Sequence, residues 1–108
     1  MQNPLLLKAS REMPKSIAII GAGTIGPDIG YYLKSAVPGL ELVLIDINQD
    51  ALDRAAKRIE AYVVKGLAKR KLTEEQAAGV REKLVFSMDY NDLAHCDWVL
   101  EAATENLD

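Results

Sequence analysis

The sequence predicts an α/β fold with a doubly wound parallel sheet, and the order of its apolar segments is the main reason. Along its 108 residues, short apolar runs typical of strands alternate with amphipathic runs typical of helices. The predicted strands cover residues 16–20, 41–45, 84–87 and 98–102. The predicted helices cover residues 25–35, 48–71 and 73–80. This alternation favours about four parallel strands joined by right-handed crossovers, with a helical excursion between the second and third strands.

The composition is that of an ordinary globular domain. Hydrophobic residues make up 49% of the chain, charged residues make up 27%, and the formal net charge is −3. This charge argues against a nucleic-acid partner, and no apolar run approaches the roughly 18 residues that would indicate a membrane-spanning helix. The single cysteine, Cys96, cannot form an internal disulfide, which suits a reducing compartment such as the cytoplasm. Residues 1–14 show no clear period, so we expect an N-terminal arm before a domain over residues 15–108.

The first strand and the first helix are predicted from local pattern. The run over 16–20 is apolar with little alternation, as in a strand that is covered on both faces. Helical spacing over 25–35 places four apolar residues on one face: Ile25, Ile29, Tyr32 and Leu33. Pro38 and Gly39 then end the helix.

The two later helices have recognisable starts. Asn48 suits the N-cap of the long helix, and Thr73 followed by Gln76 has the form of a capping box for the shorter one. Apolar residues recur along the long helix at steps of three and four: Leu52, Ala55, Ala56, Ile59, Val63 and Leu67. No helical pattern follows the fourth strand, so we expect the chain to be part of a longer domain.

A glycine-rich turn between the first strand and the first helix predicts a phosphate-binding site. Gly21 allows a tight turn out of the strand, Gly23 lets a pyrophosphate approach the backbone, and Gly26 lets the helix pack close to the strand. The start of the helix presents free N–H groups and the positive end of its dipole. Asp46 lies 20 residues after Gly26, where a carboxylate accepts hydrogen bonds from an adenosine ribose. Together these features favour a dinucleotide site of the Rossmann type over a glycine-rich connector with an incidental aspartate.

The same acid bears on the choice of cofactor. A carboxylate at Asp46 would repel the 2′-phosphate of NADP, and no basic residue follows it until Arg54. NAD is therefore favoured over NADP. FAD is less favoured than either, because FAD-binding domains share the glycine turn but usually carry Glu at the acid position.

Other polar residues point less clearly to a function. Seven of the 13 basic residues fall within 54–71, which fits either a solvated helix face or an anionic-ligand site centred on 69–71. We interpret His95 as a structural residue in a turn and Cys96 as a small buried hydrophobe. Trp98 is expected in the core. No spacing of His, Cys, Asp and Glu indicates a metal site.

With these features the sequence resembles the NAD-binding domain of the 3-hydroxyacyl-CoA dehydrogenases over residues 15–108. The matching stretches are IAIIGAGTIGPDIG (17–30), LVLIDINQDALDRAAKRIE (42–60), KRKLTEEQ (69–76) and CDWVLEAATEN (96–106). Pro27 and Gly30 stand where the family more often has other small residues.

The resemblance implies an oxidoreductase of fatty-acid metabolism that transfers hydride between NAD and an L-3-hydroxyacyl-CoA. It implies that the pyrophosphate is flanked by Gly21, Gly23, Thr24, Ile25 and Gly26. It also implies that Asp46 holds the adenosine ribose, and it places Glu101 and Ala103 near the nicotinamide. Lys69 and Arg70 become candidates for the phosphates of CoA.

The resemblance also implies parts that this sequence does not match. The catalytic His–Glu pair of the family lies further along the chain, as does the C-terminal helical domain that forms a homodimer. His95 does not correspond to that histidine. We therefore expect no catalytic residue within these 108 residues and no turnover of acetoacetyl-CoA with NADH by this chain alone.

Two other functions stay open from the sequence. One is that of a relative acting on a free hydroxy acid, as in the gulonate dehydrogenase or crystallin-like branch. The other is a non-catalytic dinucleotide-binding module, because a fold does not dictate a function. Dependence of ligand binding near Lys69 on CoA would separate the free-acid enzyme from the acyl-CoA enzyme.

Overall fold

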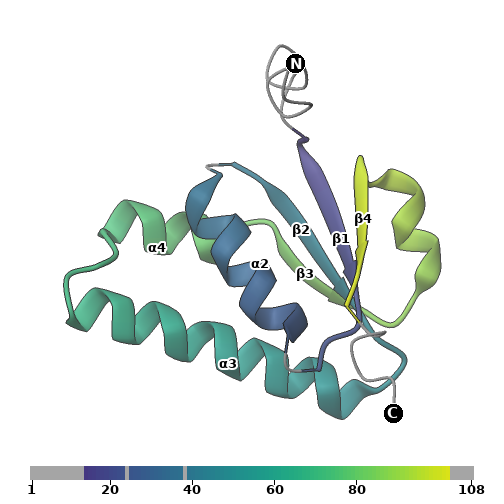
Figure 1. The fold of residues 1–108 in the computed structure, drawn as a ribbon, viewed down its shortest axis with the longest axis horizontal. Helices are drawn as coiled ribbons and strands as arrows, with labels where there is room; N and C mark the ends of the chain where they lie inside the picture. The colour runs from purple at the N-terminus through teal and green to yellow at the C-terminus, as the bar shows by residue number, and fades with distance from the viewer. Residues whose placement is uncertain (1–13, 24, 38, 103–108) are drawn as a thin grey trace, which may run out of the picture.

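A parallel sheet organises the computed structural model, which describes residues 14–23, 25–37 and 39–102 (Figure 1). The strands are β1 (Ser16–Ile20), β2 (Glu41–Ile45), β3 (Leu84–Ser87) and β4 (Trp98–Glu101). They lie in the order β3-β2-β1-β4, and every pairing between neighbours is parallel. This is the order of the first four strands of a doubly wound sheet, so the predicted fold class is confirmed.

Helices cover both faces of the sheet. The connecting elements are α2 (Ile25–Ala36), α3 (Gln49–Ala68), α4 (Glu74–Arg81) and the 3-10 helix η1 (Tyr90–His95). In Figure 1, α2, α3 and α4 gather on one side of the sheet, and η1, in yellow-green just before β4, lies on the other. The chain therefore changes face between β3 and β4, as a doubly wound fold requires.

Alternate residues of β1 and β2 face two separate hydrophobic clusters. The cluster under α2 and α3 contains Ile17, Ile19, Leu42 and Leu44. The cluster on the opposite face contains Ala18, Val43 and Ile45, with Leu93 and Cys96 packed against it. Both central strands are thus covered on both faces, as the weak alternation of residues 16–20 predicted.

The buried face of α2 differs from the predicted one. Ile29 and Leu33 pack against the core as expected, but Tyr32 is 68% exposed and Ile25 is 40% exposed. The buried residues at the start and middle of α2 are small: Gly26, Pro27 and Gly30. A Cβ on Gly30 would lie only 3.2 Å from Leu42 Cδ2, so α2 approaches the sheet too closely for a large side chain at this position.

The helix starts agree with the sequence, and the end of α3 does not. The Asn48 side chain accepts a hydrogen bond from the Ala51 N–H at 3.2 Å and caps α3. Both hydrogen bonds of the capping box at 73–76 are formed. The helix ends at Ala68 rather than near residue 71, because Arg70 adopts a left-handed conformation with φ at 59°.

Trp98 is 50% exposed, so the prediction that it lies in the core was wrong. It lies on β4, whose neighbour in the described part of the chain is β1, on one side only. Leu100 and Ala102 point into the cluster under α2 and are the parts of this segment that reach the core. A large ring on a strand is fully buried only where other segments pack around it, and the local sequence does not specify those segments. The predicted N-terminal arm lies, apart from Pro14, outside the described residues.

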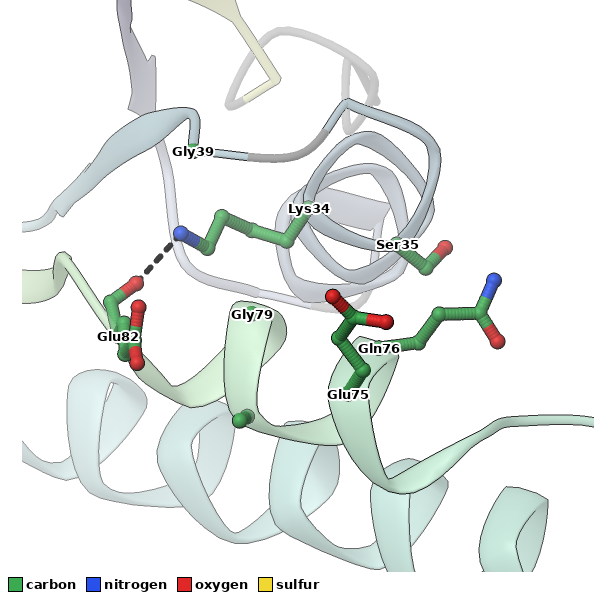
Figure 2. Close-up of a pocket in the computed structure, with 8 residues that line it drawn as sticks. Lys34, Ser35, Gly39, Glu75, Gln76, Gly79 and Glu82 are labelled. Carbon is green, nitrogen blue, oxygen red and sulfur yellow. Dashed lines mark hydrogen bonds between the residues drawn. The ribbon is translucent and has the colours of Figure 1, made fainter.

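Lys34 is buried, which the sequence did not predict. Its side chain sits at one end of a cavity of about 460 Å³ between α2 and α4, shown in Figure 2. The residue is 3% exposed, and its Nζ donates hydrogen bonds to the carbonyl oxygens of Leu40 and Glu82. These carbonyls belong to the segments that lead into β2 and β3, so one ammonium group joins both segments to α2. Burial lowers the pKa of Lys34.

We expect Lys34→Met to lower the free energy of unfolding by about 1–3 kcal/mol, because two carbonyl groups lose their donor. Chemical denaturation followed by circular dichroism measures this change. Lys57→Met on the exposed face of α3 is the matched control and should change the same quantity by less than about 0.5 kcal/mol. Equal losses from the two substitutions would contradict the structural role of Lys34.

Because the pKa of Lys34 is lowered in the folded chain, the free energy of unfolding depends on pH at this site. Between that pKa and the ordinary value of 10.5, the unfolded chain binds more protons than the folded chain at this site. The stability of the wild type relative to Lys34→Met should therefore rise with pH through this window.

Candidate cofactor-binding site

The turn that follows β1 depends on the backbone conformation of its first glycine and is hydrogen-bonded to the end of β2. Gly21 has φ at 104°, a conformation that other residues rarely adopt. Its N–H donates a hydrogen bond to the carbonyl oxygen of Ile45 at 2.7 Å. The backbone therefore leaves β1 directly toward the end of β2.

Gly26 allows α2 to begin immediately behind this turn. A Cβ on Gly26 would overlap the carbonyl oxygen of Gly21 and lie 3.2 Å from its carbonyl carbon. The expected close packing of helix against turn is therefore present, and it depends on the missing side chain.

Gly23 faces open space. A Cβ built on it would have no heavy atom within 4 Å in the described structure, and the residue is exposed. Gly23 and the exposed Ile25 at the start of α2 therefore border a free volume beside the positive end of a helix dipole. This arrangement fits an anionic group such as a diphosphate. Thr24, the remaining predicted residue of the turn, lies outside the described residues.

The carboxylate of Asp46 lies against the same turn. Its Oδ2 accepts a hydrogen bond from the Ala22 N–H at 2.9 Å, and its Oδ1 accepts one from the Asn48 N–H at 2.9 Å. A carboxylate has about four acceptor positions, so two hydrogen bonds leave capacity for sugar hydroxyls. The sequence placed this acid near the glycine turn, but did not show that it also fixes the turn.

The end of β4 adjoins the end of β1. Glu101 is the register partner of Ile20, and the Ala102 N–H donates a hydrogen bond to the Ile20 carbonyl oxygen at 2.8 Å. The exposed Glu101 thus lies at the carboxyl edge of the sheet, next to the strand that leads into the glycine turn. Doubly wound sheets bind ligands at this switch point between strands. Ala103 lies outside the described residues.

The structure does not bring Lys69 and Arg70 to the glycine turn. They follow the C-terminal end of α3, a helix of 20 residues that is about 30 Å long and begins beside Asp46. Lys69 lines a separate cavity of about 300 Å³ with Tyr31, Tyr62, Lys65, Gly66 and Lys71. Arg70 is not among these lining residues. The two tyrosines were not singled out from the sequence, because only the packing of α2 against α3 places them here.

His95 and Cys96 have surroundings that fit a structural role. His95 is exposed, and its carbonyl oxygen accepts a hydrogen bond from Ser16 Oγ at 3.1 Å. Cys96 is half-buried, and burial raises the pKa of its thiol, which disfavours the thiolate. Among the described residues there is no cluster of His, Cys, Asp and Glu that could hold a metal ion. None of the helices in that part of the chain is long and apolar enough to cross a membrane.

Known proteins are similar to this chain over most of its length. Residues 16–108 match the family model described as "3-hydroxyacyl-CoA dehydrogenase, NAD binding domain". A 3-hydroxybutyryl-CoA dehydrogenase of Bradyrhizobium diazoefficiens is 32% identical over 91 residues, which are 84% of this chain and 30% of that protein. A fatty acid oxidation complex subunit alpha of Colwellia psychrerythraea is 31% identical over 102 residues, 92% of this chain and 14% of that protein.

A solved structure agrees with these sequence matches. The crystal structure of 3-hydroxybutyryl-CoA dehydrogenase from Escherichia coli superimposes with a TM-score of 0.80 at 34% identity, covering 89% of this chain and 20% of that one. The chain therefore spans about a third or less of the length of these relatives.

Two glycine substitutions test the role of the turn. Gly26→Ala should lower the free energy of unfolding by about 1–3 kcal/mol, because its methyl group would overlap the Gly21 carbonyl. Gly79→Ala on α4 is the matched control: its methyl group would meet nothing within 4 Å, so it should stabilise the chain by about 0.5–1 kcal/mol. Urea denaturation of both variants measures the difference. A Gly26→Ala protein as stable as the wild type would show that α2 does not need this close approach.

Proposed function

We propose that this chain, which belongs to the family of NAD-binding domains of 3-hydroxyacyl-CoA dehydrogenases, is the cofactor-binding portion of an oxidoreductase of fatty-acid metabolism. The reaction proposed for the whole protein is hydride transfer between NAD and an L-3-hydroxyacyl-CoA. The observation that carries the proposal is the 2.9 Å hydrogen bond from the Ala22 amide to Asp46, because it brings the proposed ribose ligand beside the proposed phosphate-binding turn.

The glycine turn is the proposed site of the pyrophosphate. Its flanking residues would be Gly21, Gly23, Thr24, Ile25 and Gly26. Gly23 supports this placement because it borders free space, and the start of α2 supplies N–H groups and a positive dipole end. A helix N-terminus can hold an anionic group through its free N–H groups and its dipole, without a positively charged side chain.

Asp46 is the proposed ligand of the adenosine ribose. Its two backbone hydrogen bonds fix the carboxylate in place, so little ordering is needed when sugar hydroxyls donate to it. A fixed negative charge also opposes the additional phosphate of NADP. The exposed segment 47–50 beside it carries no basic residue that could offset this charge.

The carboxyl edge between β1 and β4 is the proposed place of the nicotinamide. Glu101 and Ala103 would border it, which is supported by the pairing of Glu101 with Ile20 at the end of β1. The nicotinamide, when bound, supplies the hydride chemistry. The described residues would bind and orient the cofactor at this edge.

Lys69 and Arg70 are proposed to lie near the phosphates of CoA. The cavity beside α3 favours Lys69 in this role, together with Lys65 and Lys71, because three ammonium groups around one hollow attract an anion. We further propose that the whole protein forms a homodimer and works in the cytoplasm, and that residues 15–108 form one domain of it. The single cysteine is consistent with a reducing compartment.

Binding measurements on Asp46→Asn test the proposed function. The variant should bind NAD about tenfold to a hundredfold more weakly, because hydrogen bonds to a charged acceptor are lost. Its preference for NAD over NADP should also shrink, since the repulsive charge is gone. Isothermal titration calorimetry of both dinucleotides with both proteins measures these changes.

Asp50→Asn, in the first turn of α3, is the matched control and should leave the affinity near that of the wild type. An Asp46→Asn protein that keeps both its affinity and its preference would place the ribose elsewhere. A wild-type chain that binds neither dinucleotide would overturn the proposed function.

A further inference from the structure

A charged cluster joins the first turn of α2 to the middle of α3. Asp28, in the first turn of α2, accepts hydrogen bonds from Arg58 at 2.9 Å (Nε to Oδ1) and 3.4 Å (Nη2 to Oδ2). The Tyr62 hydroxyl donates a hydrogen bond to Asp28 Oδ1 at 2.5 Å and accepts one from Arg58 Nε at 2.8 Å. The guanidinium also lies 5.7 Å from the centre of the Tyr62 ring. Arg58 is therefore held by two hydrogen bonds to Asp28, by one to the Tyr62 hydroxyl and by the contact with the Tyr62 ring.

The negative charge of Asp28 opposes binding of the proposed diphosphate at the start of α2. A carboxylate in the first turn of a helix interacts favourably with the same positive dipole end that attracts a diphosphate. Asp28 follows Gly26 by two residues, so its charge lies within about one helical turn of the phosphate-binding amides. Alone, it would reduce the attraction of this helix start for the diphosphate of a dinucleotide, which carries two negative charges.

Arg58 removes this conflict. It supplies one positive charge to one carboxylate, so the pair is neutral when seen from the glycine turn. The hydrogen bond from Arg58 also holds the pKa of the Asp28 carboxyl below its ordinary value, because it stabilises the ionised form. The Tyr62 hydroxyl donates a second hydrogen bond to Oδ1 and accepts one from Arg58, which helps to orient the guanidinium.

We infer that Arg58 is a positioning residue for cofactor affinity: by neutralising Asp28 it keeps the start of α2 electropositive for the diphosphate of NAD. This inference rests on the proposed function, because it assigns the diphosphate to the turn before α2. Both side chains are partly exposed, at 42% and 44%, so the effect on binding is moderate and is screened by salt.

The test compares NAD affinities of four proteins by isothermal titration calorimetry: the wild-type chain, Arg58→Gln, Asp28→Asn and the double variant. At low ionic strength, Arg58→Gln should raise the dissociation constant about threefold, because an uncompensated carboxylate remains. Asp28→Asn should bind as well as the wild type or better. The double variant should return to near wild-type affinity, since no charge is left at either position.

Arg81→Gln is the matched control. Arg81 forms the other ion pair of the described residues, with Glu60 at 2.5 Å, and its side chain has a similar exposure of 47%. This substitution changes the net charge by the same amount, but between α3 and α4, so it should leave NAD affinity unchanged. At about 0.5 M salt, the difference between Arg58→Gln and the wild type should disappear.

A purely structural role would give a different pattern. If Arg58 only stabilised the packing of α2 on α3, the double variant would bind no better than Arg58→Gln, and salt would not remove the defect. Either result overturns the inference, as does an equal loss in Arg81→Gln. A wild-type chain that fails to bind NAD overturns the proposed function and this inference together, whereas wild-type binding with unchanged Arg58→Gln affinity overturns the inference alone.

Discussion

The turn after β1 is bound to the end of β2 by two consecutive amides, and the rest of the site depends on that attachment. Gly21 donates to the Ile45 carbonyl, and Ala22 donates to the Asp46 carboxylate. With these two donors used, the turn is fixed by the sheet rather than by its own helix. Gly23 can then face open space without side-chain support, and the acid lies beside it. One short segment thereby sets the relative positions of the two groups proposed to bind the diphosphate and the ribose.

The features that the sequence predicted are the ones set by near neighbours along the chain. The caps at Asn48 and Thr73 join residues three apart, and the glycine turn is read within six positions. Asp46 is further away, but parallel neighbouring strands end at the same edge of a sheet. Its place beside the turn therefore follows once both strands are recognised.

The features that the sequence missed depend on contacts between distant segments. The face of α2 was misjudged because glycines, and not large apolar residues, make its closest approach to the sheet, so a hydrophobic pattern brings Tyr32 inside. Trp98 is apolar but lies on a strand with a neighbour on one described side. The pairing of Asp28 with Arg58 spans 30 residues and needs the crossing of two helices. No local rule contains that crossing.

The candidate binding site lies at the carboxyl edge of the sheet, whereas several contacts that stabilise the fold lie elsewhere. At the carboxyl edge, the candidate site combines a glycine turn with the Asp46 carboxylate, groups that bury little apolar surface. At the amino edge, Lys34 joins the segments before β2 and β3. A third hydrophobic cluster, which includes Val63 of α3 and Val80 of α4, packs these two helices together. The Asp28–Arg58 pair fits this division, because an exposed ion pair adds little stability yet acts on charge at the start of the helix.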